Sequence, residues 1–473
     1  MPTRLLFALI LLPSLIQAAP REGPSVDFSH GPLRVSENKR FLVHADNTPF
    51  LYLADTGWEL FHRLDLAETE KYLENRRAYG YTAIQCVILP EFDGLTTPNR
   101  QNHLPLIDSD PTKHNEDYFK DIDAVLSIAE KKGIYLALLP TWGDKVNKKW
   151  GQGPEIFTPE NAKTFGAFLA NRYKDRPNII WILGGDRPVE NETHRAIWRA
   201  MAAGLQSADK HHLIGYHPSG GISSSKFWTN EEPWLAFQMI QSGHARRDLP
   251  NYEMIAKDYA LTPAKPCFDG EPRYEDHPVR SSKVKGDYFN DIDTRQAAYW
   301  SVFAGSFGHT YGSHSIWSMH SEKFPAPKKL AGEMLFTWDK AIDRPGSASM
   351  QHLRNLMESR PFTTAVPAQE IIASENPKTG GHFQAIKGDG YVMIYAPEGG
   401  KLTINLKPAN LGESISVTCF NPRDGTANLK LFGGNNPTDL RFPGEPGRGN
   451  DWVLVIDNDS KKFPPPGFPK RAK

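Results

Sequence analysis

Eight short apolar runs alternate with helical patterns between residues 50 and 317, and this alternation constrains the fold more than any other feature of the chain. Each run is followed by a polar or glycine-containing loop, which is typical of a buried strand. Strands that alternate with helices in this way form a parallel sheet. The predicted strands are Phe50–Asp55, Ala83–Pro90, Ile134–Thr141, Asn178–Asp186, His212–His217, Leu235–Gln241, Pro266–Glu271 and Phe307–Ile316.

Cap residues mark the helices between these strands. Asp65 and Glu68 form a capping box at the start of the first helix. Asn115 begins a second helix, and Thr158 followed by proline begins a third. Eight strand–helix units over about 270 residues predict a (β/α)8 barrel, the TIM barrel of the α/β class. The alternative is a doubly wound sheet, but no G-x-G-x-x-G motif follows an early strand.

The pattern changes after about residue 361. Short β-branched runs follow, among them YVMIYAP, KLTINL, ISVTCF and WVLVID, and NPRDG supplies an Asp-Gly turn. We predict a small antiparallel β-sandwich over residues 361–460, after a barrel with an N-terminal arm over residues 20–360. We expect this small domain to pack on the barrel as a structural companion. The proline-rich basic tail, residues 461–473, is predicted to be disordered.

The first 19 residues have the pattern of a signal peptide. Arg4 precedes an apolar stretch over residues 5–16, and small residues follow at Ala18 and Ala19. The stretch is too short to span a membrane. We therefore predict that the protein is exported to the periplasm or the extracellular space, without membrane insertion.

Charge and cysteine usage exclude some function classes. The formal net charge is zero, so nothing points to a nucleic acid partner. No C-x-x-C pair occurs, which argues against a cysteine zinc site. The cysteine count is odd, and Cys86 and Cys267 lie inside apolar runs, so we expect buried free thiols; Cys419 lies in the C-terminal region.

Two predicted strands end in a glycine followed by a carboxylate. NIIWILGGDRP places Asp186 at the end of the fourth strand, and KPCFDGEPRYE places Glu271 at the end of the seventh. In a (β/α)8 barrel the chemistry lies at the carboxyl ends of the strands. Two carboxylates at that rim suit glycosidic bond cleavage, in which one donates a proton and the other attacks the sugar or activates water. The glycines would let a substrate lie close to the backbone.

The two acids also have competing interpretations. Asp269 is an alternative to Glu271, because it has the same parity on the strand, and Glu275 is a weaker one. Either carboxylate could instead cap the following helix or pair with a neighbouring arginine, and these alternatives stay open at this point.

Other polar and aromatic side chains at the predicted strand ends are candidate substrate contacts. They are Asp55, Trp58, Trp142, Asp144, Arg187, His217, Gln241, His244, Arg273, Tyr311 and Trp317. Basic residues in the same loops would suit a carboxylate-bearing polysaccharide, or else form an ordinary solvated surface. These are Lys145, Lys148, Lys149, Arg187, Arg246, Arg247 and Arg273.

Four segments, FLYLADTGWELFHRL, LLPTWGD, IIWILGGDRP and CFDGEPRYE, together resemble the apiosidase-like glycoside hydrolases of family 140 over about residues 25–460. FNPRDG resembles part of the C-terminal β domain of that family. The resemblance implies Asp186 as acid/base and Glu271 as nucleophile, with retention of configuration. We expect no cofactor and no catalytic metal. Gly-Gly-Asp departs from the Asn-Glu pair of the wider clan but is like family 140. The implied activity is that of an endo-apiosidase acting on side chains of the plant cell-wall pectin rhamnogalacturonan II.

Three other functions compete with this one. A metal-dependent hydrolase would need an H-x-H motif at the first strand, which is absent, and the odd spacing of His309 and His314 places them on opposite strand faces. A non-catalytic carbohydrate-binding barrel is the second alternative. The third is another pectin- or hemicellulose-directed glycosidase, such as an arabinofuranosidase or a galactanase, because the barrel and two acids do not specify the sugar.

Overall fold

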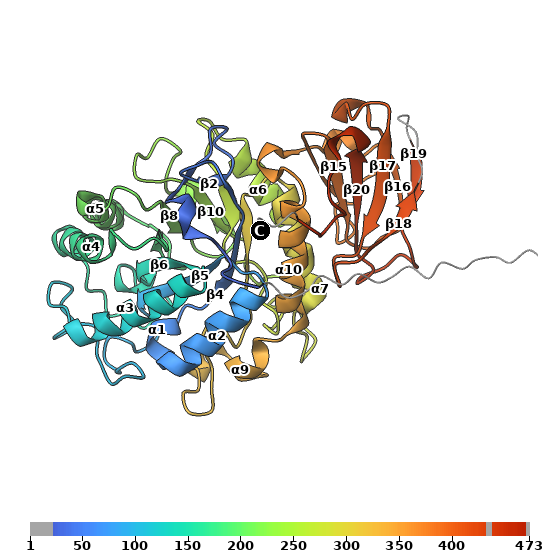
Figure 1. Cartoon of the computed structure of the whole chain (residues 1–473). Coiled ribbons are helices and arrows are strands. Elements are labelled where there is room, and N and C mark those ends of the chain that lie inside the picture. The colour runs from blue at the N-terminus through green and yellow to red at the C-terminus, as the bar shows by residue number, and fades with distance from the viewer. Residues whose placement is uncertain (1–21, 432–437, 470–473) are drawn as a thin grey trace, which may run out of the picture.

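The computed structural model describes residues 22–431 and 438–469, and it shows a barrel with a smaller β domain packed against its side (Figure 1). The predicted signal peptide and the last four residues lie outside the described part of the chain. Within that part, no helix combines the length and the apolar character that crossing a membrane requires.

All eight predicted barrel strands are confirmed. They are β4 (Tyr52–Thr56), β5 (Ala83–Leu89), β6 (Tyr135–Thr141), β7 (Ile179–Gly184), β8 (Ile214–His217), β10 (Gln238–Gln241), β11 (Cys267–Asp269) and β12 (Gly308–Tyr311). Neighbouring strands pair in parallel from β8 through β4 and β12 to β10. Between β8 and β10, the Ala236 N–H donates to the Ile214 carbonyl at 2.8 Å and closes the barrel. A two-residue strand, β9 (Ile222–Ser223), pairs antiparallel with β10.

The helices begin at the predicted caps. Asp65 and Glu68 form the expected capping box, while Asn115 and Thr158 cap the next two long helices. The long helices are α2 (Leu66–Ala78), α3 (Glu116–Lys131), α4 (Pro159–Tyr173), α5 (Glu192–Ala208), α6 (Asn251–Tyr259), α7 (Asp291–Phe303) and α10 (Pro345–Glu358). Three single-turn helices are α1 (Leu60–Arg63), α8 (Lys328–Ala331) and α9 (Trp338–Ala341).

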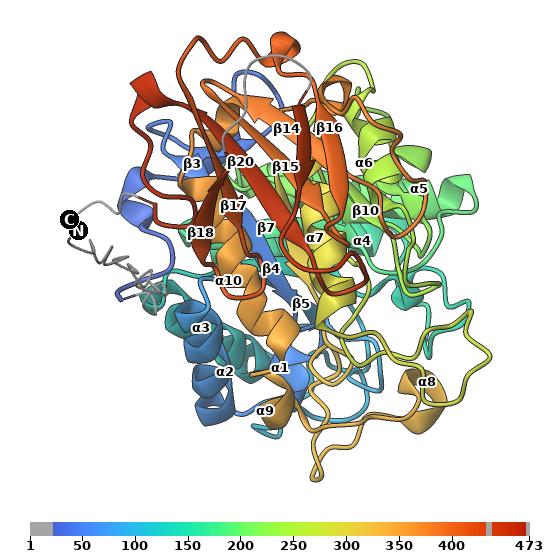
Figure 2. The ribbon, with the colours of Figure 1, turned by 90° about the vertical axis from the view of Figure 1, so that its right-hand side faces the viewer.

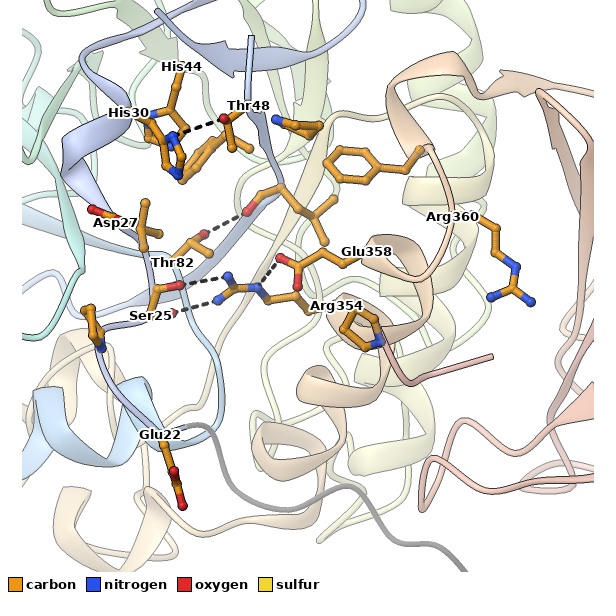
Figure 3. Close-up of a pocket in the computed structure, with 17 residues that line it drawn as sticks. Glu22, Ser25, Asp27, His30, His44, Thr48, Thr82, Arg354, Glu358 and Arg360 are labelled. Atoms are coloured by element: carbon orange, nitrogen blue, oxygen red, sulfur yellow. Dashed lines mark hydrogen bonds and ion pairs between the residues drawn. The ribbon is translucent and has the colours of Figure 1, made fainter. Parts of the chain in front are cut away.

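The N-terminal arm covers the end of the barrel where the strands begin. It forms a three-stranded antiparallel sheet of β1 (Leu33–Val35), β2 (Leu42–His44) and β3 (Pro49–Phe50). Beside it lies a cavity of about 490 Å³ that Arg354 of α10 helps to line (Figure 3). The Arg354 guanidinium donates to the Ser25 hydroxyl at 2.7 Å and to Glu358 at 2.6 Å, so it fastens the arm to the barrel.

The C-terminal domain is the predicted antiparallel sandwich. A six-stranded sheet, in the order β13-β14-β15-β20-β17-β18, faces a two-stranded sheet of β16 and β19. The strands are β13 (Val366–Pro367), β14 (Gln384–Gly388), β15 (Tyr391–Ala396), β16 (Lys401–Ile404), β17 (Ile415–Phe420), β18 (Ala427–Leu431), β19 (Thr438–Arg441) and β20 (Trp452–Asn458). Val392 and Ile394 of β15 pack with Leu402 and Leu440 of the small sheet, which makes the sandwich core.

The other face of the large sheet packs on the barrel, where it lies over α7 and α10 (Figure 2). Met393 and Tyr395 belong to the same apolar core as the barrel, and Tyr395 stacks on Tyr299 of α7 at 4.9 Å. Both faces of β15 are therefore buried, which explains its continuous apolar sequence. A buried ion pair crosses the same interface, with Arg295 Nε 2.7 Å from Asp451 Oδ2.

The first part of the predicted disordered tail is ordered, which corrects that prediction for residues 461–469. The Arg360 guanidinium donates to the Pro464 carbonyl at 2.9 Å and lies over the Phe463 ring. Phe463 also meets the ring of Tyr391 in the large sheet. An apolar side chain with a place to pack outweighs the proline-rich, basic composition of the segment. Cys86 and Cys267 are free and buried, as expected, and Cys419 is also free and buried.

The Arg295–Asp451 pair provides a test of the domain interface. Replacing Arg295 by Met leaves the buried Asp451 carboxylate with the more distant Arg423, at 3.7 Å, as its cation, so the free energy of unfolding should fall by about 3 kcal/mol. Urea unfolding followed by circular dichroism measures this. The matched control is Arg441→Met, because Arg441 pairs with Glu445 on the exposed surface and should contribute little. Equal losses in the two variants would contradict a special role for the interface pair.

Candidate active site

A pocket of about 280 Å³ lies at the carboxyl ends of the barrel strands. Its lining residues follow seven of the eight strands, so it has the position expected for a catalytic site in this fold. They are Trp58, Glu91, Trp142, Trp150, Asp186, His244, Glu271, Tyr274, His277, Arg280, His314, Trp317, Lys329 and Ala331. The larger cavity beside the N-terminal arm lies at the opposite end of the barrel, near the first residues of β4 and β5.

A left-handed turn at the end of β7 directs Asp186 into this pocket. Gly184, Gly185 and Asp186 have φ angles of 87°, 125° and 50°, a region that favours glycine. A Cβ atom on Gly184 would lie 2.3 Å from the His217 carbonyl, and one on Gly185 would lie 2.7 Å from the Gly143 nitrogen. The two glycines are therefore required by the turn and by neighbouring backbone. This corrects the expectation that they make room for substrate.

Glu271 enters the pocket from the loop after β11. The glycine before it also serves packing, since a Cβ on Gly270 would lie 2.0 Å from the Met239 side chain. One Glu271 oxygen lies 2.9 Å from His217 Nε2, and the other lies 3.2 Å from His244 Nε2. Burial raises the pKa of Glu271, but the contacts and charges of the two histidines outweigh it and hold this pKa well below its usual range. The carboxylate is therefore kept ionised.

The pKa of Asp186 is shifted in the opposite direction, above its usual range. Burial raises its pKa, the nearby charge of Glu271 raises it further, and Arg187 and His217 offset only part of this. Arg187 Nη1 lies 3.0 Å from Asp186 Oδ2, and the Trp150 indole N–H donates to the same oxygen at 3.1 Å. The pocket thus holds one carboxyl group inclined to keep its proton and one carboxylate kept ionised, as acid and nucleophile of a retaining glycosidase require.

Aromatic rings form the wall behind the two acids. Trp58, Trp142 and His217 lie with ring centroids 5.2–5.5 Å apart. The Trp58 indole N–H donates to the Tyr274 hydroxyl at 3.0 Å and so links this wall to the loop that carries Glu271. Trp150 stands apart, because it is 55% exposed at the mouth of the pocket. A ring held in this way offers a flat face on which a sugar can stack.

The structure brings most of the sequence-predicted side chains to the pocket. Trp58, Trp142, His244 and Trp317 line it together with the two acids. His217 and Arg187 lie directly behind it, where each touches one of the carboxylates. The alternatives Asp269 and Glu275 are buried elsewhere: Asp269 accepts from the Ser242 hydroxyl, and Glu275 accepts from the Tyr311 hydroxyl.

Apart from Arg187 and His217, which lie behind the pocket, five predicted substrate contacts do not line it, and the structure corrects them. Asp55 faces the helix layer, where it pairs with Arg76 of α2 at 2.6 Å. It does so because β4 continues to Thr56, so the side chain points away from the barrel interior. The other four are Asp144, paired with Lys145; Arg273, which donates to Gln296 of α7; Tyr311, which donates to Glu275; and the buried Gln241.

The predicted basic rim is largely neutralised within the protein. Lys145, Lys149, Arg187, Arg246 and Arg247 each pair with a carboxylate of the chain, and Arg273 is buried. Two other cations line the pocket instead. Arg280 and Lys329 are exposed, and neither has an ion pair with any residue that the structure describes.

Sequence reasoning missed several lining residues. Glu91 follows the second strand directly, so the rule that selected the other strand-end residues would have found it. Tyr274, His277 and Arg280 lie in the loop that carries Glu271. Trp150 and Lys329 belong to long loops without a periodic pattern, and no sequence signal marks them. His314 had been considered only as a metal ligand.

The additional histidines do not form a metal site. His277 stacks on His244 at 4.3 Å and meets His314 edge to face at 4.6 Å. Burial lowers the pKa of His277 well below its usual range and that of His314 to about 3, so both rings are neutral near pH 7. Among the described residues, no group of three or more His, Cys, Asp or Glu side chains is arranged to hold a metal ion.

Known protein families match both parts of the chain. The family described as "Apiosidase-like, catalytic domain" matches residues 36–364, which include every residue of the pocket. The family described as "Putative collagen-binding domain of a collagenase" matches residues 366–457, which span the C-terminal sandwich. No curated protein matches the chain.

Two solved structures are similar over nearly the whole chain. A glycoside hydrolase family 5 protein from Bacteroides vulgatus is 31% identical, with a TM-score of 0.85, and the match covers 93% of this chain and 96% of that one. A structure described as a glycoside hydrolase is 32% identical, with a TM-score of 0.83, over 92% of this chain and 98% of that one.

The turn that carries Asp186 can be tested by substitution of Gly185. A Cβ there meets both an unfavourable φ and the Gly143 and Trp142 atoms, so Gly185→Ala should lower the free energy of unfolding by about 2–4 kcal/mol. The control is Gly221→Ala, which has a φ of 78° but no atom within 4 Å, and should cost about 1 kcal/mol. Thermal unfolding measures both. Equal losses would mean that contact with Gly143 and Trp142 does not matter.

Proposed function

The chain belongs to the apiosidase-like family of catalytic domains and is a glycoside hydrolase, and we propose that it is an endo-apiosidase that cleaves an apiosyl linkage in the side chains of pectic rhamnogalacturonan II. The observation that carries the proposed chemistry is the pair of carboxyl groups, Asp186 and Glu271, whose pKa values move in opposite directions within one pocket. The resemblance of the four strand-end segments to family 140 supports the apiosyl linkage and the pectic substrate.

The proposed reaction is a double displacement with retention of configuration. Glu271 attacks the anomeric carbon while Asp186 gives its proton to the departing glycosidic oxygen, and a glycosyl ester of Glu271 forms. In the second step Asp186, now ionised, takes a proton from a water molecule that attacks the same carbon and releases Glu271. His217 and His244 hold Glu271 in position and stabilise its negative charge before attack and after release.

The charge of the pocket mouth supports an acidic substrate. Arg280 and Lys329 line the same pocket as Asp186 and Glu271, and both cations are exposed whereas Glu271 is buried. Cations that have no ion pair within the described part of the chain suit the carboxylates of galacturonate residues next to the cleaved linkage. A plant cell-wall polysaccharide is encountered outside the cell, and we propose that the predicted signal peptide exports the protein to the periplasm or beyond.

The first test is incubation of the purified protein with rhamnogalacturonan II, arabinan and galactan, with products read by mass spectrometry. We expect an oligosaccharide ending in reducing apiose from rhamnogalacturonan II only. Asp186→Asn should lower turnover by about 10²–10⁴-fold while affinity is retained, because only proton transfer is removed. Glu271→Gln should abolish the covalent intermediate. NMR of the first-formed product should show the retained anomeric configuration.

The outcomes separate the competing functions. If oligosaccharides are released from arabinan or galactan instead, the two-carboxylate mechanism stands and the proposed substrate is wrong. Binding of rhamnogalacturonan II without any release would identify a carbohydrate-binding barrel, and an inverted product would exclude Glu271 as a nucleophile.

The two unpaired cations give a separate test of substrate charge. Arg280→Gln combined with Lys329→Gln should raise KM for the acidic substrate about tenfold, with little change in kcat, because neither cation is among the described groups that pair with Asp186 or Glu271. Added salt should raise the KM of the wild-type protein toward that of the double variant, because it screens the charges. The control, Lys226→Gln, removes an exposed cation that lies outside the pocket. An unchanged KM in the double variant would contradict recognition of substrate carboxylates here.

A further inference from the structure

A third carboxylate lies beside the two proposed catalytic groups. Glu91 follows β5, lines the same pocket, and lies 2.8 Å from Arg187 Nη2. The other terminal nitrogen of that guanidinium lies 3.0 Å from Asp186 Oδ2. One arginine that is 2% exposed therefore bridges two carboxyl groups, and Trp150 stacks over it with 4.8 Å between the guanidinium carbon and the ring centroid.

The backbone of Glu91 is held in place by buried charged groups. The Glu59 carboxylate accepts the backbone N–H of Glu91 at 3.2 Å, and the Lys145 ammonium donates to the Glu91 carbonyl at 3.1 Å. Neither Glu59 nor Lys145 is exposed to solvent. A surface carboxylate that neutralised Arg187 by chance would not be expected to have such support beneath it.

We propose that Glu91 is a positioning residue for the acid/base carboxyl: by sharing the Arg187 guanidinium with Asp186, it keeps the proton on Asp186 between turnovers. The inference rests on the proposed function. An arginine that paired with Asp186 alone would stabilise the ionised form and draw the proton away. The negative charge of Glu91 offsets this cation while Asp186 is protonated. Once Asp186 has given its proton to the leaving oxygen, the same guanidinium stabilises its carboxylate until water restores the proton.

The surrounding charges define how this arrangement responds to pH. The charged or titratable groups that face Asp186 are Glu271 from the β11 loop, Arg187 beside it, His217 at the end of β8, and Glu91 through the shared guanidinium. Those that face Glu91 are Arg187, Asp186 and Asp144 after β6, together with Glu59 and Lys145 against its backbone. Burial, offset in part by Arg187, raises the pKa of Glu91 to about 7, so its negative charge is present above that pH and lost below it.

The test is Glu91→Gln, which keeps the size of the side chain and removes its charge. Without that charge the ionised form of Asp186 becomes more stable, so its pKa falls and the proton is lost at lower pH. The alkaline limb of kcat/KM should therefore shift down by about one pH unit. Glu91→Asp retains the charge, so its alkaline limb should lie close to that of the wild type. The control Glu190→Gln removes a carboxylate that pairs with Lys149 at the rim and should leave the limb in place.

A second readout does not depend on the substrate. With ¹³C-labelled aspartate, the carboxyl signal that is absent from Asp186→Asn identifies Asp186, and its titration midpoint should be lower in Glu91→Gln. An unchanged midpoint in a folded variant would overturn the inference even if the enzyme is active. A lowered midpoint in a protein that cleaves no glycan would leave the inference standing and overturn the proposed function. If Glu91→Gln does not fold, Glu91→Asp decides: a limb and midpoint like those of wild type are then expected, and a midpoint lowered although the charge is retained overturns the inference.

Discussion

The site depends on the left-handed turn that ends β7. Three successive residues, Gly184, Gly185 and Asp186, have positive φ angles, and the first two have no room for a side chain. The turn is fixed by backbone hydrogen bonds from Gly185 to His217 and from Gly143 to Gly185. Asp186 is thereby placed against Arg187 and within the field of Glu271. A strand that ended in any ordinary turn would direct this carboxyl group elsewhere.

Around this turn, most buried charges of the site share a partner. Arg187 bridges Asp186 and Glu91, and Lys145 pairs with Asp144 while it also holds the loop after β5. Two histidines face the single carboxylate of Glu271. The two histidines lower the pKa of Glu271, while burial and the charge of Glu271 raise that of Asp186. Burial alone would not separate the two acids, because it raises the pKa of both.

The sequence predicted the barrel, the sandwich and both acids, because strand ends and helix caps are local signals. It could not predict on which side of a strand end a side chain would lie. Asp55 faces the helices because β4 continues one residue past it, so that its side chain alternates with Ala54 and Thr56, and Arg273 lies against α7. Nor could it place Trp150 or Lys329, which reach the pocket from long loops through tertiary contacts. Glu91 was within reach of the same strand-end rule that selected Trp58 and Trp142.

The position of β20 in the large sheet has a consequence for how the chain is made. It is the last strand of the described chain, yet it lies between β15 and β17, at the middle of the sheet that covers α7 and α10 (Figure 2). During synthesis the barrel segments leave the ribosome first, and the sheet that covers these helices stays incomplete until residues 452–458 emerge. Completion of the fold therefore waits for nearly the whole chain, and premature termination would leave that side open to aggregation.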